Sequence, residues 1–318
     1  MPEQVDYASL VQALEASVKR NLSDGLLLSG GLDTAIIAYL AARWRKPYCV
    51  TVALEGAPAP DIPCAKLIAV NLGLKHDLHY FGEDELDEAI SATIRVLKVF
   101  DPMEVRNSAA AYVALKTARD LGLATVMTGD GGDELFAGYS FLFKHTPAQL
   151  DKALKKMWSQ MRFSSVPLGK ALGVEVRIPF LDPEFRAYAE RVDVGLKVRS
   201  ENGQTWGKWV LRKAFEGIIS KEVAWRVKAP LEVGTGTTTL PAFFDARITD
   251  AEFRRKKAKY SADGVTVRDK EHLKYYEAFR SIHGIPGAVA RGDKKCPDCG
   301  TGVAQDVTFC RTCGAYPV

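Results

Sequence analysis

Two glycine-rich segments contain the groups that could bind a phosphate together with a divalent cation. Residues 29–34 read Ser-Gly-Gly-Leu-Asp-Thr, residues 128–134 read Thr-Gly-Asp-Gly-Gly-Asp-Glu, and each segment follows a short apolar run. Backbone N–H groups at the start of a helix can surround a phosphate, and glycine lets the backbone approach it closely. Carboxylates beside phosphate oxygens are ligands that Mg²⁺ prefers. A tight strand-to-helix turn capped by Asp33 is the simpler alternative for the first segment.

The second segment strengthens the prediction of a cation site. It holds three carboxylates within five residues, those of Asp130, Asp133 and Glu134. Because the neighbouring glycines cannot shield them, these charges would repel one another without a cation. The alternative is a solvated acidic turn, which the apolar residues on both sides disfavour. The chain contains neither a Walker-type loop nor the dinucleotide-binding glycine pattern, so neither explains a phosphate site here.

The last 23 residues contain four of the six cysteines, arranged as two Cys-x-x-Cys pairs. The pairs are Cys296 with Cys299 and Cys310 with Cys313, and a glycine follows each of them. Four thiolates at this spacing predict a closed tetrahedral Zn²⁺ site, which is typical of a structural ribbon. An iron–sulfur or redox site is the alternative. The remaining thiols, of Cys49 and Cys64, are isolated, and we expect them to be buried.

The elements that would position the two glycine-rich segments alternate between helices and strands. Apolar periodicity predicts the helix Val5–Leu22, the strand Leu26–Leu28, the helix Asp33–Trp44, the strand Tyr48–Leu54, a helix near Asp61–Leu72, the strand His76–Phe81, the helices Asp84–Phe100 and Arg106–Leu121, and the strand Ala124–Thr128. This alternation is typical of a parallel sheet covered by helices. Both glycine-rich segments should therefore leave the sheet at its carboxyl edge, where such sheets bind ligands.

The second half of the chain is expected to form a mainly helical lobe from Phe141 to about Gly284. The breaker cluster Gly284–Gly287 follows, and beyond it helical periodicity is lost. We therefore place a domain boundary near residue 288. The predicted domains are residues 1–288, which hold the sheet and the helical lobe, and residues 289–318, which hold the cysteines.

Length and composition exclude disordered, collagen-like and mini-protein chains but do not identify the function. The 318 residues carry 43 Lys and Arg against 39 Asp and Glu, a formal net charge of +4 that neither requires nor forbids an anionic partner. No apolar run approaches the roughly 18 residues that span a membrane, and the start lacks a signal-peptide pattern. We expect a soluble, cytoplasmic protein without a membrane partner.

The glycine-rich segments resemble the synthetase domain of the asparagine synthetase family. The second segment continues to Tyr139 as TGDGGDELFAGY, and two further blocks follow in the family's order, at 173–182 (GVEVRIPFLD) and 211–217 (LRKAFEG), the latter leading to Trp225–Lys228. The resemblance covers roughly residues 5 to 240. It implies an α/β fold with the parallel sheet of the pyrophosphate-loop ATPases, the adenine nucleotide alpha-hydrolase type, together with the helical lobe and the zinc ribbon.

The resemblance implies an enzyme that uses Mg·ATP to adenylate a carboxylate, releases pyrophosphate and lets an amine attack the acyl-adenylate. It assigns a role to each matching residue. The residues implied to bind ATP and its pyrophosphate portion are Leu28, Ser29, Gly30, Gly31, Asp33 and Thr34, with Val52, Thr128 and Gly129 at the AMP. Asp33 and Asp133 would bind Mg²⁺, Asp130 would lie near the acyl centre, and Lys228 would stabilise charge on the α-phosphate and pyrophosphate. Arg106 would bind the substrate carboxylate, although a surface or ion-paired arginine is an equal alternative.

The departures from the family bear on the substrate and the nitrogen source. Family members usually begin with a glutaminase domain whose catalytic Cys follows Met, whereas this chain begins Met1-Pro2. We expect no glutamine hydrolysis by that route, with free ammonia or a separate donor protein supplying nitrogen. Val166–Lys170 replaces the family's Asp-Arg-x-Ser-Met stretch. Aspartate, giving asparagine, stays the default substrate.

Two other functions compete with this hypothesis. The first is a pyrophosphate-loop enzyme that adenylates a tRNA base, with the zinc ribbon and the basic run Arg254–Lys259 gripping RNA. The ribbon's weak net charge makes RNA the less favoured partner. The second is a non-catalytic ATP-binding scaffold, which the joint presence of Asp33, Asp130, Asp133 and Lys228 disfavours.

Overall fold

The computed structural model describes residues 6–201, 203–287 and 293–318. Val5, where the first helix was expected to begin, and the boundary expected near residue 288 lie outside these ranges. The chain divides into two compact units, each assembled from separate stretches of sequence. Unit 1 comprises residues 1–51, 60–79 and 117–230, and unit 2 comprises residues 52–59, 80–116 and 231–318.

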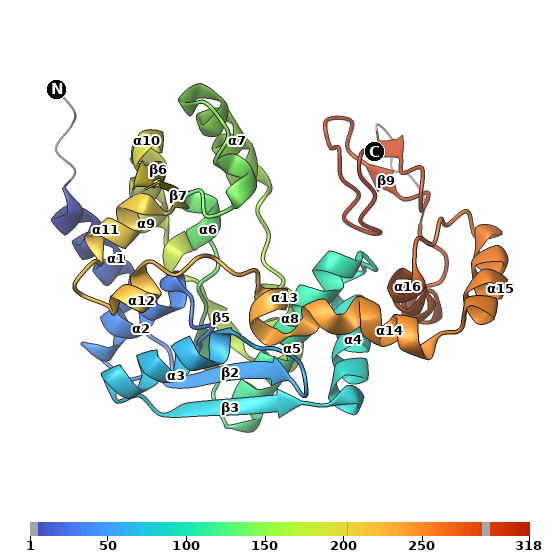
Figure 1. The fold of residues 1–318 in the computed structure, drawn as a ribbon, viewed down its shortest axis with the longest axis horizontal. Coiled ribbons are helices and arrows are strands. Elements are labelled where there is room, and N and C mark those ends of the chain that lie inside the picture. Colours follow the sequence, from blue (N-terminus) through green and yellow to red (C-terminus); the bar gives the residue numbers. More distant parts are fainter. Residues whose placement is uncertain (1–5, 202, 288–292) are drawn as a thin grey trace. The chain divides into compact units, whose positions relative to one another are not determined.

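A five-stranded sheet is built from strands between residues 25 and 177. Its strands are β1 (Gly25–Leu27), β2 (Tyr48–Leu54), β3 (His76–Phe81), β4 (Thr125–Met127) and β5 (Glu175–Arg177), in the spatial order β3-β2-β1-β4-β5. The pairs β1–β2, β1–β4 and β4–β5 are parallel. The strand order reverses at β1, which has β2 on one side and β4 on the other, and ligands of open α/β sheets bind at such a switch point. The predicted parallel sheet is therefore confirmed (Figure 1).

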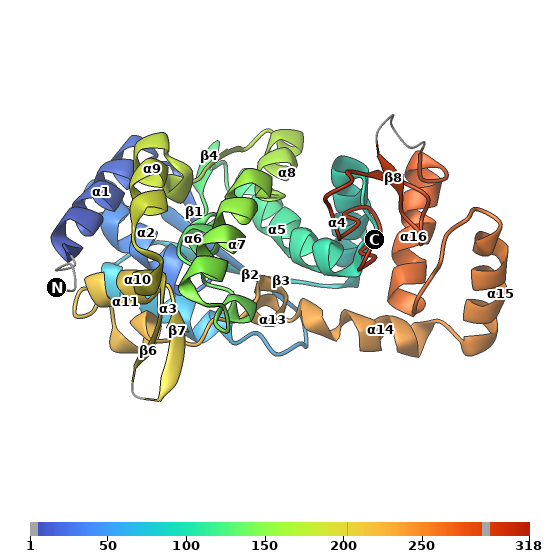
Figure 2. The same cartoon turned by 90° about the horizontal axis from the view of Figure 1, so that it is seen from above.

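Helices of unit 1 surround a single apolar core. Unit 1 holds β1, β4, β5 and the first four residues of β2 and of β3, and its other elements are α1 (Tyr7–Arg20), α2 (Leu32–Ala42), α3 (Asp61–Leu72), α6 (Gly132–Leu135), η1 (Ser140–Leu142), α7 (Pro147–Gln160), α8 (Ser165–Leu172), η2 (Pro179–Leu181), α9 (Pro183–Arg191), α10 (Val194–Lys197), β6 (Val198–Glu201), β7 (Gln204–Gly207), α11 (Trp209–Ala214) and α12 (Lys221–Ala224). Leu10, Leu14 and Val18 recur at helical spacing and are buried, so α1 presents one apolar face to the core. Figures 1 and 2 both show α1 beside α2 and beside α9.

The segment expected to be mainly helical contains three strands that periodicity did not predict. One is β5, which completes the sheet beside β4. The others are β6 and β7, an antiparallel hairpin in which Glu201 pairs with Gln204. Each of these strands has only three or four residues, too few for an alternating pattern to stand out. The sequence Asn202-Gly203 between β6 and β7 is nonetheless a hairpin signal, and Gly203 has a φ of 77°.

Unit 2 is mainly helical and builds its own core around Phe100. Its elements are α4 (Glu83–Leu97), most of α5 (Pro102–Asp120), α13 (Leu231–Thr235), η3 (Thr237–Thr239), α14 (Leu240–Arg247), α15 (Asp250–Ser261), α16 (Lys270–His283), β8 (Lys294–Lys295) and β9 (Gly302–Val303). The Phe100 ring lies 5.3 Å from that of His272, 5.1 Å from Tyr276 and 5.0 Å from Phe279, all on α16. Figure 2 shows α16 running beside α4. Burial at this centre lowers the pKa of His272 to about 3, so its ring is neutral.

Local chemistry sets the limits of α4 and α5, which differ from the predicted ones. The predicted helix Asp84–Phe100 ends three residues earlier, because Lys98 adopts a left-handed conformation with a φ of 57°. The predicted helix Arg106–Leu121 begins one turn earlier, at Pro102, where proline's missing N–H costs no hydrogen bond. Asp101 accepts a hydrogen bond from the Met103 N–H there. None of the described helices is long and apolar enough to cross a membrane.

We predict that Asp182→Ala lowers the free energy of unfolding by about 1–2 kcal/mol, because Asp182 has two roles in unit 1. It accepts hydrogen bonds from the first turn of α9 and pairs with Arg20 of α1 at 2.5 Å. Arg20 holds the pKa of Asp182 below its usual value, so the ion-pair contribution is present above about pH 3.9 and is lost as the pH falls through the folded-state pKa.

Urea unfolding of the variant and the wild type at pH 7 and near pH 3 checks this expectation. Glu184→Gln is the matched control, because Glu184 also pairs with Arg20 but its side chain is 79% exposed. A stability difference that grows as the pH falls would contradict the assignment.

Candidate active site

The two glycine-rich loops pack directly against each other at the carboxyl ends of β1 and β4. Gly31 precedes α2, and Gly131, with a φ of 87°, precedes α6. A Cβ atom at Gly129 would lie 2.9 Å from a methyl group of Thr34, and one at Gly132 would lie 2.7 Å from the Asp33 carboxyl carbon. These positions are therefore glycine because the loops leave no room for a side chain.

Hydrogen bonds fix the loop after β1 from within and from the segment after α12. The Ser29 and Thr34 hydroxyls lie 3.1 Å apart, and the Gly31 N–H donates to Ser29 Oγ at 3.3 Å. Arg226 donates to the carbonyl oxygens of Gly30 at 3.0 Å and Pro60 at 2.9 Å. Its guanidinium also lies 2.7 Å from Asp61 Oδ1. The loop is therefore held in shape by side chains before any ligand enters.

The three carboxylates of the second loop point to three different sets of partners. Asp130 accepts hydrogen bonds from Thr128 Oγ1 at 2.9 Å and Ser165 Oγ at 2.5 Å, and burial raises its pKa. Glu134 accepts one from the Tyr139 hydroxyl at 2.5 Å, and burial raises its pKa as well. The third carboxylate, of Asp133, pairs with lysines. The repulsion expected within the loop is thus relieved by separation and by protein cations.

Two lysines neutralise the carboxylates of Asp33 and Asp133. Lys208 Nζ lies 2.5 Å from Asp33 Oδ2 and 2.7 Å from Asp133 Oδ1, and Lys228 Nζ lies 2.6 Å from Asp133 Oδ2. We call these four residues the carboxylate–lysine cluster. Although burial disfavours charge, the two lysines hold the pKa of Asp133 below its usual value, and the two carboxylates raise the pKa of Lys208. Burial raises the pKa of Asp33, whose Oδ1 is buried and accepts no hydrogen bond from any described residue.

Lys208 is the functional candidate that the sequence analysis missed. Its side chain is 5% exposed, and its backbone is left-handed with a φ of 54°. Ala137 has the same φ, and the Lys208 N–H donates to the neighbouring Phe136 carbonyl oxygen at 2.9 Å. Left-handed non-glycine residues cost about 1–3 kcal/mol and concentrate at functional sites. In sequence, the signal is only a Gly-Lys pair three residues before the block that begins at Leu211.

Arg212 connects the segments that carry the two lysines. It is 4% exposed and donates to the carbonyl oxygens of Gly207 at 2.9 Å, Ala224 at 2.7 Å and Arg226 at 3.0 Å. Gly207 precedes Lys208, and Arg226 precedes Lys228 by two residues. Arg212 therefore positions both lysines through the backbone, which explains why an arginine follows Leu211 in this block.

The remaining predicted nucleotide-binding residues occupy ordered positions near the strands. Leu28 follows β1, is 1% exposed, and donates its N–H to the Val50 carbonyl oxygen at 2.8 Å. Thr128 and Gly129 follow β4 in the loop described above. Val52 is 5% exposed within β2. The assignment of these residues to ATP stays a prediction.

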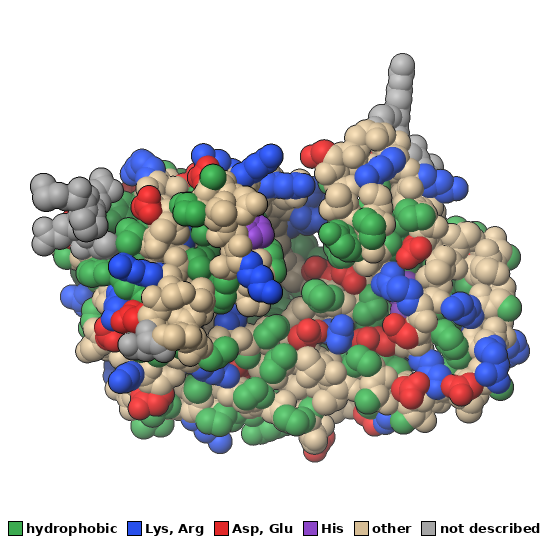
Figure 3. Space-filling view, turned by 45° about the horizontal axis from the view of Figure 1, so that its top comes forward, with side chains coloured by type: hydrophobic (Ala, Val, Ile, Leu, Met, Phe, Trp, Pro, Cys, Tyr) green, Lys and Arg blue, Asp and Glu red, His purple; other side chains and the backbone are tan. Residues whose placement is uncertain are grey.

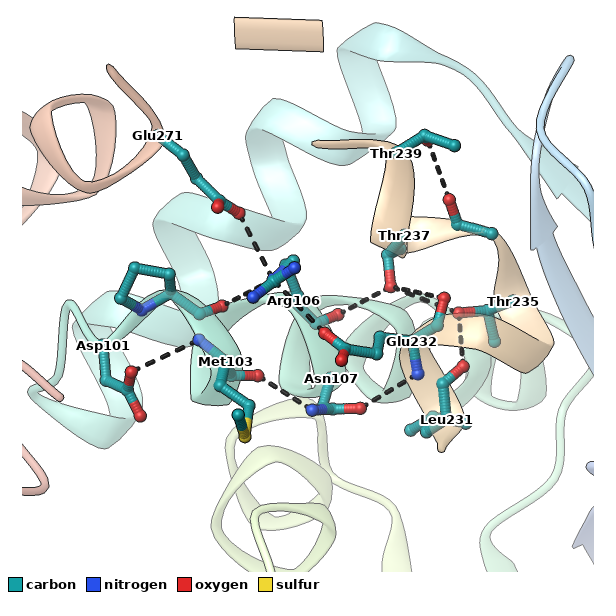
Figure 4. Close-up of polar contacts among 12 residues, drawn as sticks. Asp101, Met103, Arg106, Asn107, Leu231, Glu232, Thr235, Thr237, Thr239 and Glu271 are labelled. Carbon is teal, nitrogen blue, oxygen red and sulfur yellow. Dashed lines mark hydrogen bonds and ion pairs between the residues drawn. The ribbon is translucent and has the colours of Figure 1, made fainter. Parts of the chain in front are cut away.

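Arg106 lies on α5 in unit 2, between two carboxylates. Its Nε lies 3.2 Å from Glu232 Oε2 and 3.5 Å from Glu271 Oε1, and Figure 4 shows the three side chains converging. Tyr275 donates a hydrogen bond to Glu271 at 2.9 Å, and burial raises the pKa of Glu271 to about 7. The contacts that Arg106 makes within unit 2 are therefore those expected of an ion-paired arginine. Its role in binding a substrate stays a prediction.

The four cysteines of the tail come together as predicted. Their sulfur atoms all lie within 4.8 Å of one another, all four side chains are buried, and all are free thiols. The Cys296–Cys313 and Cys299–Cys310 sulfur distances are both 3.7 Å. Four ligands at about 2.3 Å from one Zn²⁺ would place sulfurs roughly 3.8 Å apart, so the cluster fits a tetrahedral zinc ion.

The cysteine tail packs against other parts of unit 2. The Phe100 N–H donates to the Thr312 carbonyl oxygen at 2.6 Å, and Arg268 donates to that of Cys313, also at 2.6 Å. Gly314 has a φ of 79°, and a Cβ atom there would overlap the Asp101 carboxylate. The second cysteine pair therefore rests on the residues that start α5.

Sequence comparisons find relatives over most of the chain. The Asparagine synthase family matches residues 8–168 and 153–268. The chain is 31% identical to the glutamine-hydrolyzing asparagine synthetase B of Escherichia coli, over 89% of this chain and 55% of that protein. It is 30% identical to a probable asparagine synthetase of Schizosaccharomyces pombe, over 87% of this chain and 56% of that protein. The chain thus spans about half the length of the curated relatives it matches.

Among solved structures, the chain is similar to an NMN synthetase of Francisella tularensis. The TM-score is 0.39 and the sequence identity 14%, over 89% of this chain and 96% of that chain.

We predict that Lys208→Met lowers the free energy of unfolding by about 3–5 kcal/mol, because it leaves two buried carboxylates facing each other without their shared cation. Lys213→Met is the matched control on α11, the helix that follows Lys208, since Lys213 pairs with the more exposed Glu201 and Glu216. The control should lose less than about 1 kcal/mol. Denaturant unfolding in a metal-free buffer measures both effects, and equal losses would show that Lys208 has no special role.

Proposed function

Because the chain belongs to the asparagine synthase family, we propose that it is an ATP-dependent ligase that converts a carboxylate into an amide. In the first step a carboxylate oxygen forms a bond to the α-phosphorus of ATP, and the bond to the β-phosphate oxygen breaks with release of pyrophosphate. In the second step ammonia attacks the acyl carbon, AMP leaves, and the nitrogen loses a proton. The tRNA-modifying enzyme and the ATP-binding scaffold are the competing hypotheses.

The carboxylate–lysine cluster at the sheet's switch point is the observation that carries this proposal. It lies beside the loop 29–34, whose backbone N–H groups and helix start suit a pyrophosphate. Asp33 and Asp133 would hold Mg²⁺, and the buried Asp33 Oδ1, which has no hydrogen-bond partner among the described residues, fits such an ion. When bound, the metal neutralises phosphate charge.

The two lysines differ in their exposure to solvent, and we assign them different roles for that reason. The Lys228 side chain is 28% exposed and can meet a nucleotide, whereas Lys208 is almost fully buried. We assign to Lys228 the stabilisation of the negative charge that develops on the α-phosphate and on the leaving pyrophosphate. We assign to Lys208 the role of holding the two aspartates in place before ATP arrives.

Asp130 is suited to accept the proton that the attacking nitrogen loses. Its carboxylate is buried, its pKa is raised, and two hydroxyl groups fix its orientation. A carboxylate whose pKa is raised toward neutrality is a better base than an exposed one. Ser165, directly before the stretch that departs from the family, would thereby orient the base.

Aspartate stays the default acyl substrate and ammonia the default nitrogen source, with a separate donor protein as the alternative. Arg106 is the proposed carboxylate ligand. For that role either Glu232 or Glu271 would have to give up its contact with Arg106, because both carboxylates lie beside the Arg106 guanidinium.

The RNA alternative depends mainly on α15, which exposes Arg254, Arg255, Lys257 and Lys259. Figure 3 shows blue Lys and Arg side chains over this helix, with red carboxylates among them. Lys256 is already paired with Glu252 and Glu277. This mixed surface suits a solvated helix better than a phosphate-binding stripe.

For the tail we propose one structural Zn²⁺ on Cys296, Cys299, Cys310 and Cys313. A site closed by four thiolates leaves no coordination position for a substrate. We also propose that residues 1–288 and 289–318 are two domains. The cysteine tail nevertheless packs against other parts of unit 2.

Pyrophosphate release tests the proposed function. The purified chain would be incubated with Mg·ATP, ammonium and a panel of carboxylates that includes aspartate, and pyrophosphate and AMP would be measured together. We expect equal amounts of both, dependent on one carboxylate. Copurifying RNA that stimulates release would favour the RNA alternative, and no release with any partner would favour the scaffold.

We predict that Lys228→Ala reduces turnover by about 100-fold or more while changing ATP affinity less, since its charge is assigned to the transition state. Steady-state pyrophosphate release against ATP concentration separates the two effects. Lys221→Ala, an exposed lysine of α12, is the control. If only the Michaelis constant changes, Lys228 merely binds ATP.

We predict that the double variant Cys296→Ser and Cys299→Ser loses about one bound zinc per chain and destabilises unit 2. The reason is that Thr312 and Cys313 accept hydrogen bonds from that unit. Metal analysis and hydrogen exchange of residues 100–106 measure the two effects. Cys64→Ser is the control, because Cys64 lies outside the cluster. Unchanged exchange at residues 100–106 would mean that the tail folds on its own.

A further inference from the structure

A cavity of about 190 Å³ in unit 1 adjoins the carboxylate–lysine cluster and has no role in the reaction described so far. The loop 138–143 after α6, strand β7, Arg212 of α11 and residues 227–230 line it. Its lining includes four aromatic side chains, which are those of Tyr139, Phe141, Phe143 and Trp206. We call this cavity the aromatic pocket.

The aromatic side chains that line the pocket are held in place by contacts with one another and with neighbouring residues. The Tyr139 and Phe141 rings stack at 5.5 Å with an angle of 14° between them, and Trp206 meets Trp225 edge to face at 5.2 Å. Phe143 packs on Gly207, where a Cβ atom would lie 2.8 Å from the ring. Phe141 is nevertheless 64% exposed. An exposed ring stacked over a preformed cavity is an arrangement that suits a flat apolar ligand.

The polar end of the pocket is cationic. Lys228 and Arg212 both line the pocket: Lys228 Nζ lies 5.3 Å from the centre of the Tyr139 ring, and the Arg212 guanidinium carbon lies 4.9 Å from that of Trp206. No carboxylate is among the described residues that line the pocket. A ligand with an aromatic ring and a negative charge would therefore match both ends of the cavity.

The volume limits the size of that ligand. An apolar protein cavity of about 150 Å³ holds one benzene molecule. The aromatic pocket, at about 190 Å³, is slightly larger, so it has room for one ring with a short substituent. None of the residues predicted to bind AMP, which are Val52, Thr128 and Gly129, is among the described residues that line the pocket, so we assign the pocket to the second substrate.

We propose that the aromatic pocket binds the ring of a single-ring aromatic carboxylate and directs its carboxylate toward Lys228, which makes this class of compound the acyl substrate. This inference rests on the proposed ligase function and replaces its default substrate, aspartate. The ring stacks against Phe141 and Trp206. The carboxylate then lies beside the lysine assigned to the α-phosphate, where adenylation takes place.

Binding and turnover with phenylacetate test the proposal separately. Saturation-transfer NMR without ATP should detect phenylacetate but neither acetate nor aspartate on the wild-type chain. Phe141→Ala should weaken phenylacetate binding roughly tenfold, because it removes one face of the ring site. Trp44→Ala is the control, since Trp44 is 50% exposed in the same unit and lies outside the pocket. Circular dichroism would confirm that both variants are folded.

Pyrophosphate release should have a higher kcat/KM with phenylacetate or benzoate than with aspartate, and Phe141→Ala should abolish that preference. Release with aspartate alone, or phenylacetate binding that Phe141→Ala leaves unchanged, would overturn the inference and leave the ligase function standing. Phe141-dependent binding with no release from any carboxylate would support the pocket as a ring-binding site and overturn the ligase function.

Discussion

The Lys208 ammonium between the carboxylates of Asp33 and Asp133 is the interaction on which the rest of unit 1 depends. Two aspartates from different loops could not stay buried together without a cation, and this lysine supplies one from a third segment. The left-handed backbone at Lys208, the glycines at 129, 132, 138 and 207, and the buried Arg212 all serve to bring that ammonium to its place. Protein groups alone thus set the geometry of the two loops that we propose bind phosphate.

The same arrangement explains why two lysines with similar partners can have different roles. Lys208 is buried and meets both aspartates, whereas Lys228 is partly exposed, meets one, and borders the aromatic pocket. A buried charge that is fully paired fixes geometry, and a charge that can exchange partners can follow the movement of charge in a reaction. The proposed division between preparing the site and stabilising the reaction follows from this difference in exposure.

Much of the site could be predicted because its residues are consecutive, whereas contacts between distant segments could not. The two loops, their strands and the cysteine pairs are local patterns, and the structure has them where the sequence predicted. Lys208 and Ser165 carry no such pattern, since each acts through an aspartate that is distant in sequence. The strands β5, β6 and β7 were missed because they are short and gain their stability from neighbours. Arg106 shows the converse, since a local resemblance could not reveal that Glu232 and Glu271 face it.

The core of unit 2 has a consequence for how the protein is made. Phe100 packs on His272, Tyr276 and Phe279, so 172 positions separate the first pair of contacting rings. At a synthesis rate of roughly 5–20 residues per second, the ribosome needs about 10–30 seconds to produce the partners of Phe100. During that interval the apolar faces of α4 and α5 lack α16 and the cysteine tail. The nascent chain therefore exposes these apolar faces throughout that interval, although the strands of its sheet up to β4 are synthesised early.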